Sequence, residues 1–63
     1  MIVGELVVAK WCVPGVAPDH GRREMMGLFM GQDIEFDDWH WKIFAGLNIK
    51  KLSKRYWTVE KFR

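Results

Sequence analysis

The chain has 63 residues, of which ten are Lys or Arg and eight are Asp or Glu, so its formal net charge is only +2. This length predicts one compact domain over residues 1–63 and leaves little room for the walled pocket that an enzyme needs. Cys12 is the single cysteine, which excludes an internal disulfide and indicates a reducing compartment. We therefore expect a cytoplasmic, non-enzymatic protein.

The first expected element is a strand. Residues 2–13 are dense in β-branched and aromatic side chains and end at the turn signal Pro14-Gly15. Neither alternating set of side chains is cleanly polar, which is typical of a strand covered on much of both faces. The stretch does not resemble a signal peptide, because it has no positively charged residues before its apolar part, contains Glu5 and is too short. No stretch approaches the roughly 18 apolar residues of a membrane span, so we expect a soluble, unprocessed chain without a membrane partner.

The middle of the chain predicts helices, with strands as the competing interpretation. After a loop at 14–21, the apolar side chains of residues 22–30 recur at spacings of one, three and four. Residues 39–47 place most of their large apolar side chains on one arc of a helix, with Trp41 outside that arc. Alternation of large side chains in both segments keeps the strand interpretation open.

The last element, residues 55–62, alternates strong β-formers and favours a strand over a helix. The combined prediction is a small α+β single domain. In it, an antiparallel sheet formed by the N- and C-terminal strands packs against one or two short helices.

Charge is divided unevenly along the chain. Residues 1–41 hold three Lys or Arg and seven Asp or Glu, whereas residues 42–63 hold seven Lys or Arg and one Glu. One interpretation is a solvated basic element attracted intramolecularly to the acidic stretch at 33–38. The other is a surface for an anionic partner.

Nine aromatic rings and four Met are more than so small an interior can hide, and contiguous exposed apolar surface usually marks an interface. The leading hypothesis is a non-enzymatic interaction protein: an inhibitor, an adaptor or a small subunit of a larger assembly. It would bind another protein through exposed aromatics and the basic C-terminal element. The predicted contact residues are Trp57, Tyr56, Arg55, Trp41, Lys50, Lys51 and Lys54.

The alternative is a module for single-stranded nucleic acid built on residues 50–63. Its lysines and Arg55 would contact phosphates, and Trp57 would stack on a base. No CxxC or HExxH spacing is present, so we expect neither a metal site nor a cofactor.

Overall fold

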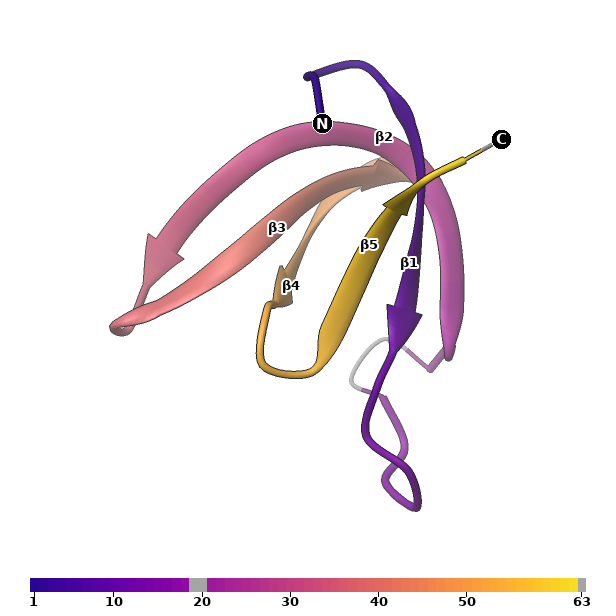
Figure 1. Ribbon diagram of the computed structural model, residues 1–63, viewed down its shortest axis with the longest axis vertical. Helices are drawn as coiled ribbons and strands as arrows, with labels where there is room; N and C mark the ends of the chain where they lie inside the picture. Colours follow the sequence, from indigo (N-terminus) through magenta and orange to yellow (C-terminus); the bar gives the residue numbers. More distant parts are fainter. Residues whose placement is uncertain (19–20, 63) are drawn as a thin grey trace.

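The computed structural model describes residues 1–18 and 21–62, and within these ranges the chain forms five strands and no helix (Figure 1). The strands are β1 (Leu6–Trp11), β2 (Glu24–Glu35), β3 (Asp38–Ala45), β4 (Asn48–Ser53) and β5 (Trp57–Lys61). All pair antiparallel in one sheet with the spatial order β4-β3-β2-β1-β5.

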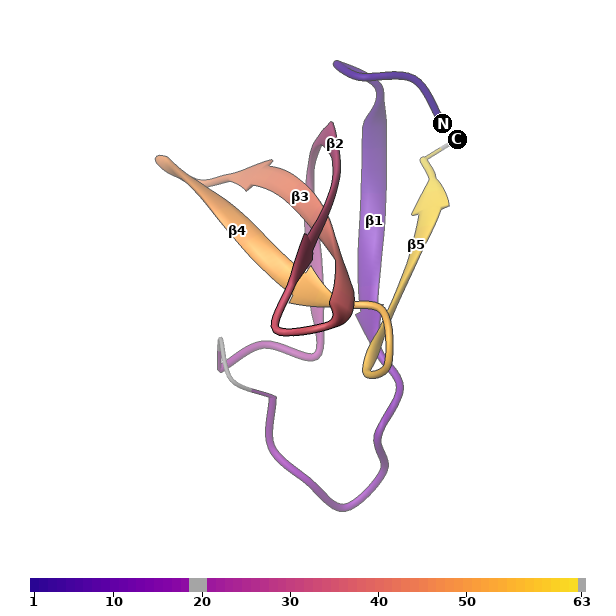
Figure 2. The same ribbon diagram turned by 90° about the vertical axis from the view of Figure 1, so that its left-hand side faces the viewer.

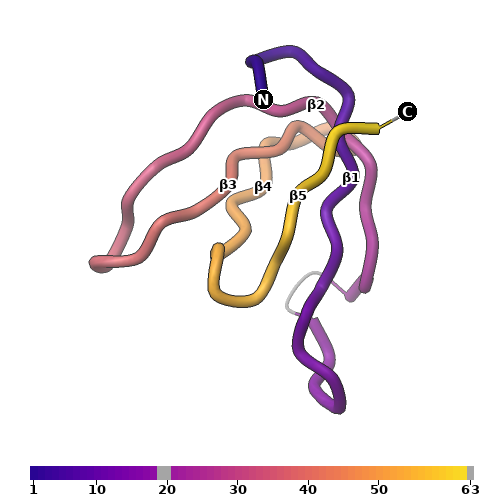
Figure 3. Tube along the Cα trace, in the orientation of Figure 1, coloured from indigo at the N-terminus to yellow at the C-terminus, as the bar shows by residue number. Residues whose placement is uncertain are grey.

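The sheet is strongly curled. Its edge strands, β4 and β5, follow one another in the chain and are joined by a short turn at residues 54–56. The long strand β2 bends over the others and pairs with β3 and with β1, as the ribbon and the trace show (Figures 1, 2 and 3). A β-bulge between Phe29 and Gly31 lies within this bend. The curl gives the sheet an inner face and an outer face.

The α+β prediction is wrong, because the helices expected at 22–30 and 39–47 are the strands β2 and β3. Along β2, Met25 and Phe29 point inward and are buried, whereas Met26 and Leu28 point outward and are exposed. Because the outward side chains are apolar as well, β2 lacks the polar alternation that marks a half-buried strand. The strands expected near the two ends are confirmed as β1 and β5.

The core occupies the inside of the curl. Its members come from all five strands and are at most 7% exposed. They are Val7, Ala9, Met25, Phe29, Ile43, Ala45, Leu52 and Trp57. Gly27 belongs to the same inward row, where an added Cβ would come within 2.4 Å of the carbonyl oxygen of Phe44. The absence of a side chain at this position therefore lets β3 approach β2 closely.

A two-residue turn joins β2 to β3. Glu35 and Asp38 close the hairpin, and the two residues between them have positive φ, 53° at Phe36 and 60° at Asp37. Positive φ at both central residues is the pattern of a type I′ turn, which normally takes Asn-Gly. A bulky residue in this conformation is strained, and the Phe36 side chain is 93% exposed.

Candidate functional site

All nine aromatic residues lie within the described ranges, and only two of them are buried: Phe29, at 4% exposed, and Trp57, at 2%. Trp11 and Trp41 are partly buried. The remaining five are exposed: Phe36, Trp39, Phe44, Tyr56 and Phe62. The expectation that part of the aromatic surface stays outside the core is confirmed.

The structure places Trp57 in the core. Its ring contacts that of Trp11 edge to face at 5.3 Å, and its carbonyl oxygen accepts a hydrogen bond of 3.2 Å from Trp41 Nε1. A partner cannot reach a side chain that is 2% exposed without opening the fold. The predicted anchor at this position is therefore inaccessible in the folded chain.

The end of the β2–β3 hairpin carries a surface that combines large apolar side chains with one cation. Ile34 and Trp39 are directly paired across the two strands and are 55% and 51% exposed. Trp41 lies two residues further along β3 on the same face. We call Ile34, Trp39, Trp41 and Lys54 the aromatic–lysine surface.

Lys54 lies in the turn between β4 and β5, and its side chain packs against the rings of Trp39 and Trp41. Its Nζ lies 4.3 Å from the ring centroid of Trp41 and 5.7 Å from that of Trp39, and it donates a hydrogen bond to Gln32 Oε1. Both distances are within the range of cation–π attraction. The backbone N–H of Lys54 also donates to the carbonyl oxygen of Trp39 at 3.0 Å, which fixes the turn to the hairpin. The cation is therefore positioned rather than freely moving.

Tyr56 lies on the other side of the same turn. Its ring is 42% exposed and contacts that of Trp11 at 5.7 Å. It also lines a hollow of about 320 Å³ together with Phe36 and Arg55. Tyr56 is thus accessible and lies between the core aromatics and the tip of the hairpin.

Two of the predicted basic contacts are neutralised within the chain. Lys51 Nζ lies 3.0 Å from the carboxylate of Glu35 and 3.6 Å from that of Asp33. The hydrogen bond to Glu35 raises the pKa of Lys51 above its ordinary value. Arg55 Nε lies 3.2 Å from Asp38 Oδ1. These pairs match the interpretation in which the basic element is attracted to the acidic stretch at 33–38.

The acid that pairs with Arg55 is itself well fixed. The Ser53 hydroxyl donates a hydrogen bond to Asp38, and this bond, followed by the charge of Arg55, lowers the pKa of the Asp38 carboxyl. Lys50 lies away from these acids, in a separate hollow of about 290 Å³ lined also by Arg22 and Leu47. The predicted contact residues therefore do not form one continuous basic surface.

Sequence reasoning missed three accessible residues near the hairpin end: Ile34, Phe36 and Trp39. The helical interpretation of 39–47 put Trp39 in a buried arc. The alternation of Trp39, Trp41 and Ile43 was the signal that would have placed the two tryptophans on one face of a strand.

No family model matches the chain, and no curated protein or solved structure is significantly similar to it. Among the described residues, no three His, Cys, Asp or Glu side chains are grouped so that they could hold a metal ion. The same residues contain no helix of the length and apolarity needed to cross a membrane. The aromatic–lysine surface is therefore the feature of the chain that indicates a function.

Proposed function

We propose that this chain is a small non-catalytic binding module that recognises another protein through the aromatic–lysine surface. The observation that carries the proposal is the pair of half-exposed apolar side chains, Ile34 and Trp39, beside a cation held over two tryptophan rings. Trp is among the residues that dominate binding energy at protein interfaces. A segment with an apolar side chain for Trp39 and a carboxylate for Lys54 fits this chemistry.

The strained turn at the hairpin tip supports the same location. A phenylalanine with φ of 53° costs free energy that Asn or Gly would avoid, and its ring is 93% exposed, so it gains almost no burial in return. Strain of this kind is found preferentially at functional sites. We infer that Phe36 contributes to the contact with the partner.

A protein partner accounts for the charges better than a nucleic acid does. Lys51 and Arg55 are paired with carboxylates, and four acidic residues lie between positions 33 and 38 beside the surface. Phosphates would meet these acids, which would offset the gain from releasing counterions. Lys54 next to Trp39 is an arrangement that also suits a stacked base.

The test is affinity capture from lysate of the source cells, with and without nuclease, followed by binding measurements on the captured partner. Trp39→Ala should weaken binding by about 2 kcal/mol, as truncation of an interface anchor does. Phe36→Asn should weaken binding while stabilising the fold, a combination that partial unfolding cannot produce. Leu47→Asn is the matched control, because Leu47 is 92% exposed in the turn between β3 and β4.

A partner whose affinity is unchanged by both Trp39→Ala and Phe36→Asn would refute the proposal. Loss of capture on nuclease treatment, together with a fall in affinity as salt rises, would instead assign the surface to nucleic acid.

A further inference from the structure

The outer face of the sheet carries a continuous apolar row that the aromatic–lysine surface does not use. Leu6 is paired with Leu28, Leu28 with Phe44, and Phe44 with Ile49. At the other edge the N–H of Phe62 donates to the carbonyl oxygen of Leu6 at 3.0 Å, which extends the row directly after β5. Each of the strands β1 to β4 therefore contributes one residue to this line, and Phe62, which directly follows β5, contributes the fifth. We call these five residues the apolar row.

Every side chain of the apolar row is between 39% and 51% exposed. Met26, at 52% exposed, and Val8 lie in the adjacent row on the same face. A complete large side chain has a surface of roughly 200 Å². At their exposed fractions, the apolar row and Met26 together leave on the order of 500 Å² of apolar surface in contact with water. Patches of this size on a soluble monomer are usually functional. A standard interface buries roughly 800 Å² on each partner, so the apolar face alone supplies well over half of one.

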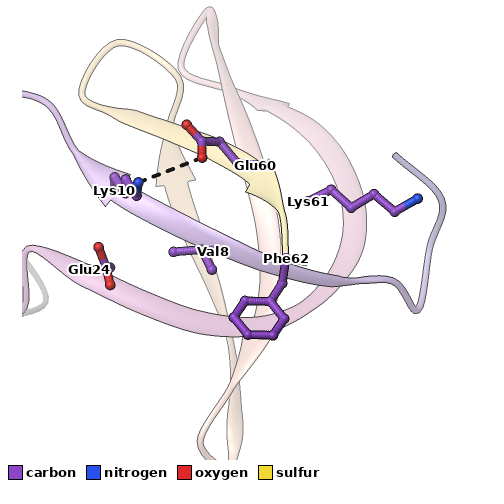
Figure 4. A pocket seen from close by; sticks show the side chains of 6 residues that line it. All are labelled: Val8, Lys10, Glu24, Glu60, Lys61 and Phe62. Atoms are coloured by element: carbon purple, nitrogen blue, oxygen red, sulfur yellow. Dashed lines mark ion pairs between the residues drawn. The ribbon is translucent and has the colours of Figure 1, made fainter.

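A shallow hollow borders the apolar row on β1 and β5. It has a volume of about 600 Å³, and its lining residues are Val8, Lys10, Glu24, Glu60, Lys61 and Phe62. Figure 4 shows Val8 between the ring of Phe62 on one side and the ion pair of Lys10 with Glu60, 3.7 Å apart, on the other. The hollow therefore has an apolar centre and a rim that carries the charges of Lys10, Glu24 and Glu60, while the ammonium group of Lys61 points away from it and lies 3.0 Å from Glu5 Oε2.

We propose that the apolar row and this hollow form a two-fold contact between two copies of the chain. In a two-fold contact the same patch must be complementary to itself. A rim with charges of both signs meets that condition, because a rotated copy can place its Lys10 opposite Glu24 of the first copy, and the reverse. The rotation also brings the apolar row of each copy toward the apolar centre of the hollow in the other.

The charges and the size of the domain both favour a second copy over other occupants. A nucleic acid would be repelled by Glu24 and Glu60, which outnumber Lys10 at the rim. The net charge of +2 produces little repulsion between two copies. A core of 63 residues supplies only about 3–5 kcal/mol, and dimerisation adds to that stability by mass action.

The experiment is sedimentation equilibrium of the full chain from about 1 μM to about 1 mM, a span that resolves dissociation constants in the micromolar range. The expected result is a shift from the monomer mass to twice that mass, with a melting temperature that rises with protein concentration. Leu28→Lys and Ile49→Lys should each raise the dimer dissociation constant by at least about tenfold, because each places two buried charges in the contact. Ile49 lies on edge strand β4 and is 51% exposed, so its variant remains informative if Leu28→Lys fails to fold.

Leu47→Lys, which adds the same charge outside the apolar row, should dimerise like the parent. Trp39→Ala should also dimerise like the parent, which separates this contact from the proposed binding site. A chain that stays monomeric up to the highest concentration would overturn the proposal. So would open-ended assembly, or a dimer that both lysine variants leave intact.

Discussion

Replacement of Trp57 by Ala distinguishes a core residue from a binding residue. The Trp57 side chain is 2% exposed and contacts Trp11, and its backbone carbonyl accepts a hydrogen bond from the Trp41 indole. Truncating a buried Trp to Ala costs about 3–5 kcal/mol. Since the whole core of a domain this small supplies about 3–5 kcal/mol, Trp57→Ala should be largely unfolded at room temperature.

The measurement is urea denaturation followed by circular dichroism, with two companion variants. Trp57→Phe keeps an aromatic ring and loses only the difference in buried area, so it should fold and lose about 1 kcal/mol. Trp39→Ala removes a tryptophan that is 51% exposed and should lose less than about 1 kcal/mol. If Trp57→Ala kept the urea midpoint of the parent chain, the assignment of this ring to the core would be refuted.

Three further predictions concern stability. Gly27→Ala should destabilise the fold by about 1–3 kcal/mol in urea, since its Cβ would meet the carbonyl oxygen of Phe44 at 2.4 Å; a neutral result would contradict the close strand approach. Phe36→Asn should raise the unfolding free energy by about 1 kcal/mol by relieving the positive φ, and a loss would show that the ring stabilises the turn. The pKa of Asp38 lies below its ordinary value of 3.8, chiefly because the Ser53 hydroxyl donates a hydrogen bond to the carboxylate. The ionised Asp38 carboxylate therefore contributes its full stability above about pH 3.8, and this stability is lost as the pH falls through the lowered pKa. Asp38→Asn should therefore show a smaller drop in urea midpoint between about pH 6 and about pH 2 than the parent, and equal drops would remove this carboxyl as a cause of acid sensitivity.

The two terminal strands could be predicted from sequence because local composition alone decides them. β1 and β5 are dense in β-branched and aromatic residues, and the turn signal Pro14-Gly15 follows the first. The long central strand β2 could not be predicted in the same way. In β2 the exposed Met26 and Leu28 are as apolar as their buried neighbours, so the spacing of apolar residues fits a helix as well as a strand.

Part of the candidate site was also open to prediction. The sequence predicts Trp41, Lys54 and Tyr56 as contact residues, and the structure leaves each at least partly accessible. The orientation of Trp57 was open to prediction but was missed: in β5 it shares a face with Val59, whereas the polar residues Thr58 and Glu60 point to the opposite face. The sequence could not show that Lys51 pairs with the acids of β2, since that contact depends on the order of strands in the sheet.

The apolar outer face and the failed helix prediction for residues 22–30 have one physical origin. A sheet face that meets only water gains nothing from large apolar side chains, and polar residues in place of Met26 and Leu28 would have given the first half of β2 its usual alternation. Leu28 lies on this outer face, and Trp39 lies on the opposite face of the hairpin. The bulge between Phe29 and Gly31 separates their positions along the hairpin. Because the two contacts share no side chains, Leu28→Lys should weaken self-association and Trp39→Ala should weaken partner binding, and a double variant should show each loss at the size measured alone. A double variant whose losses differ from the single values by more than about 0.5 kcal/mol would show that the two faces are coupled through the hairpin.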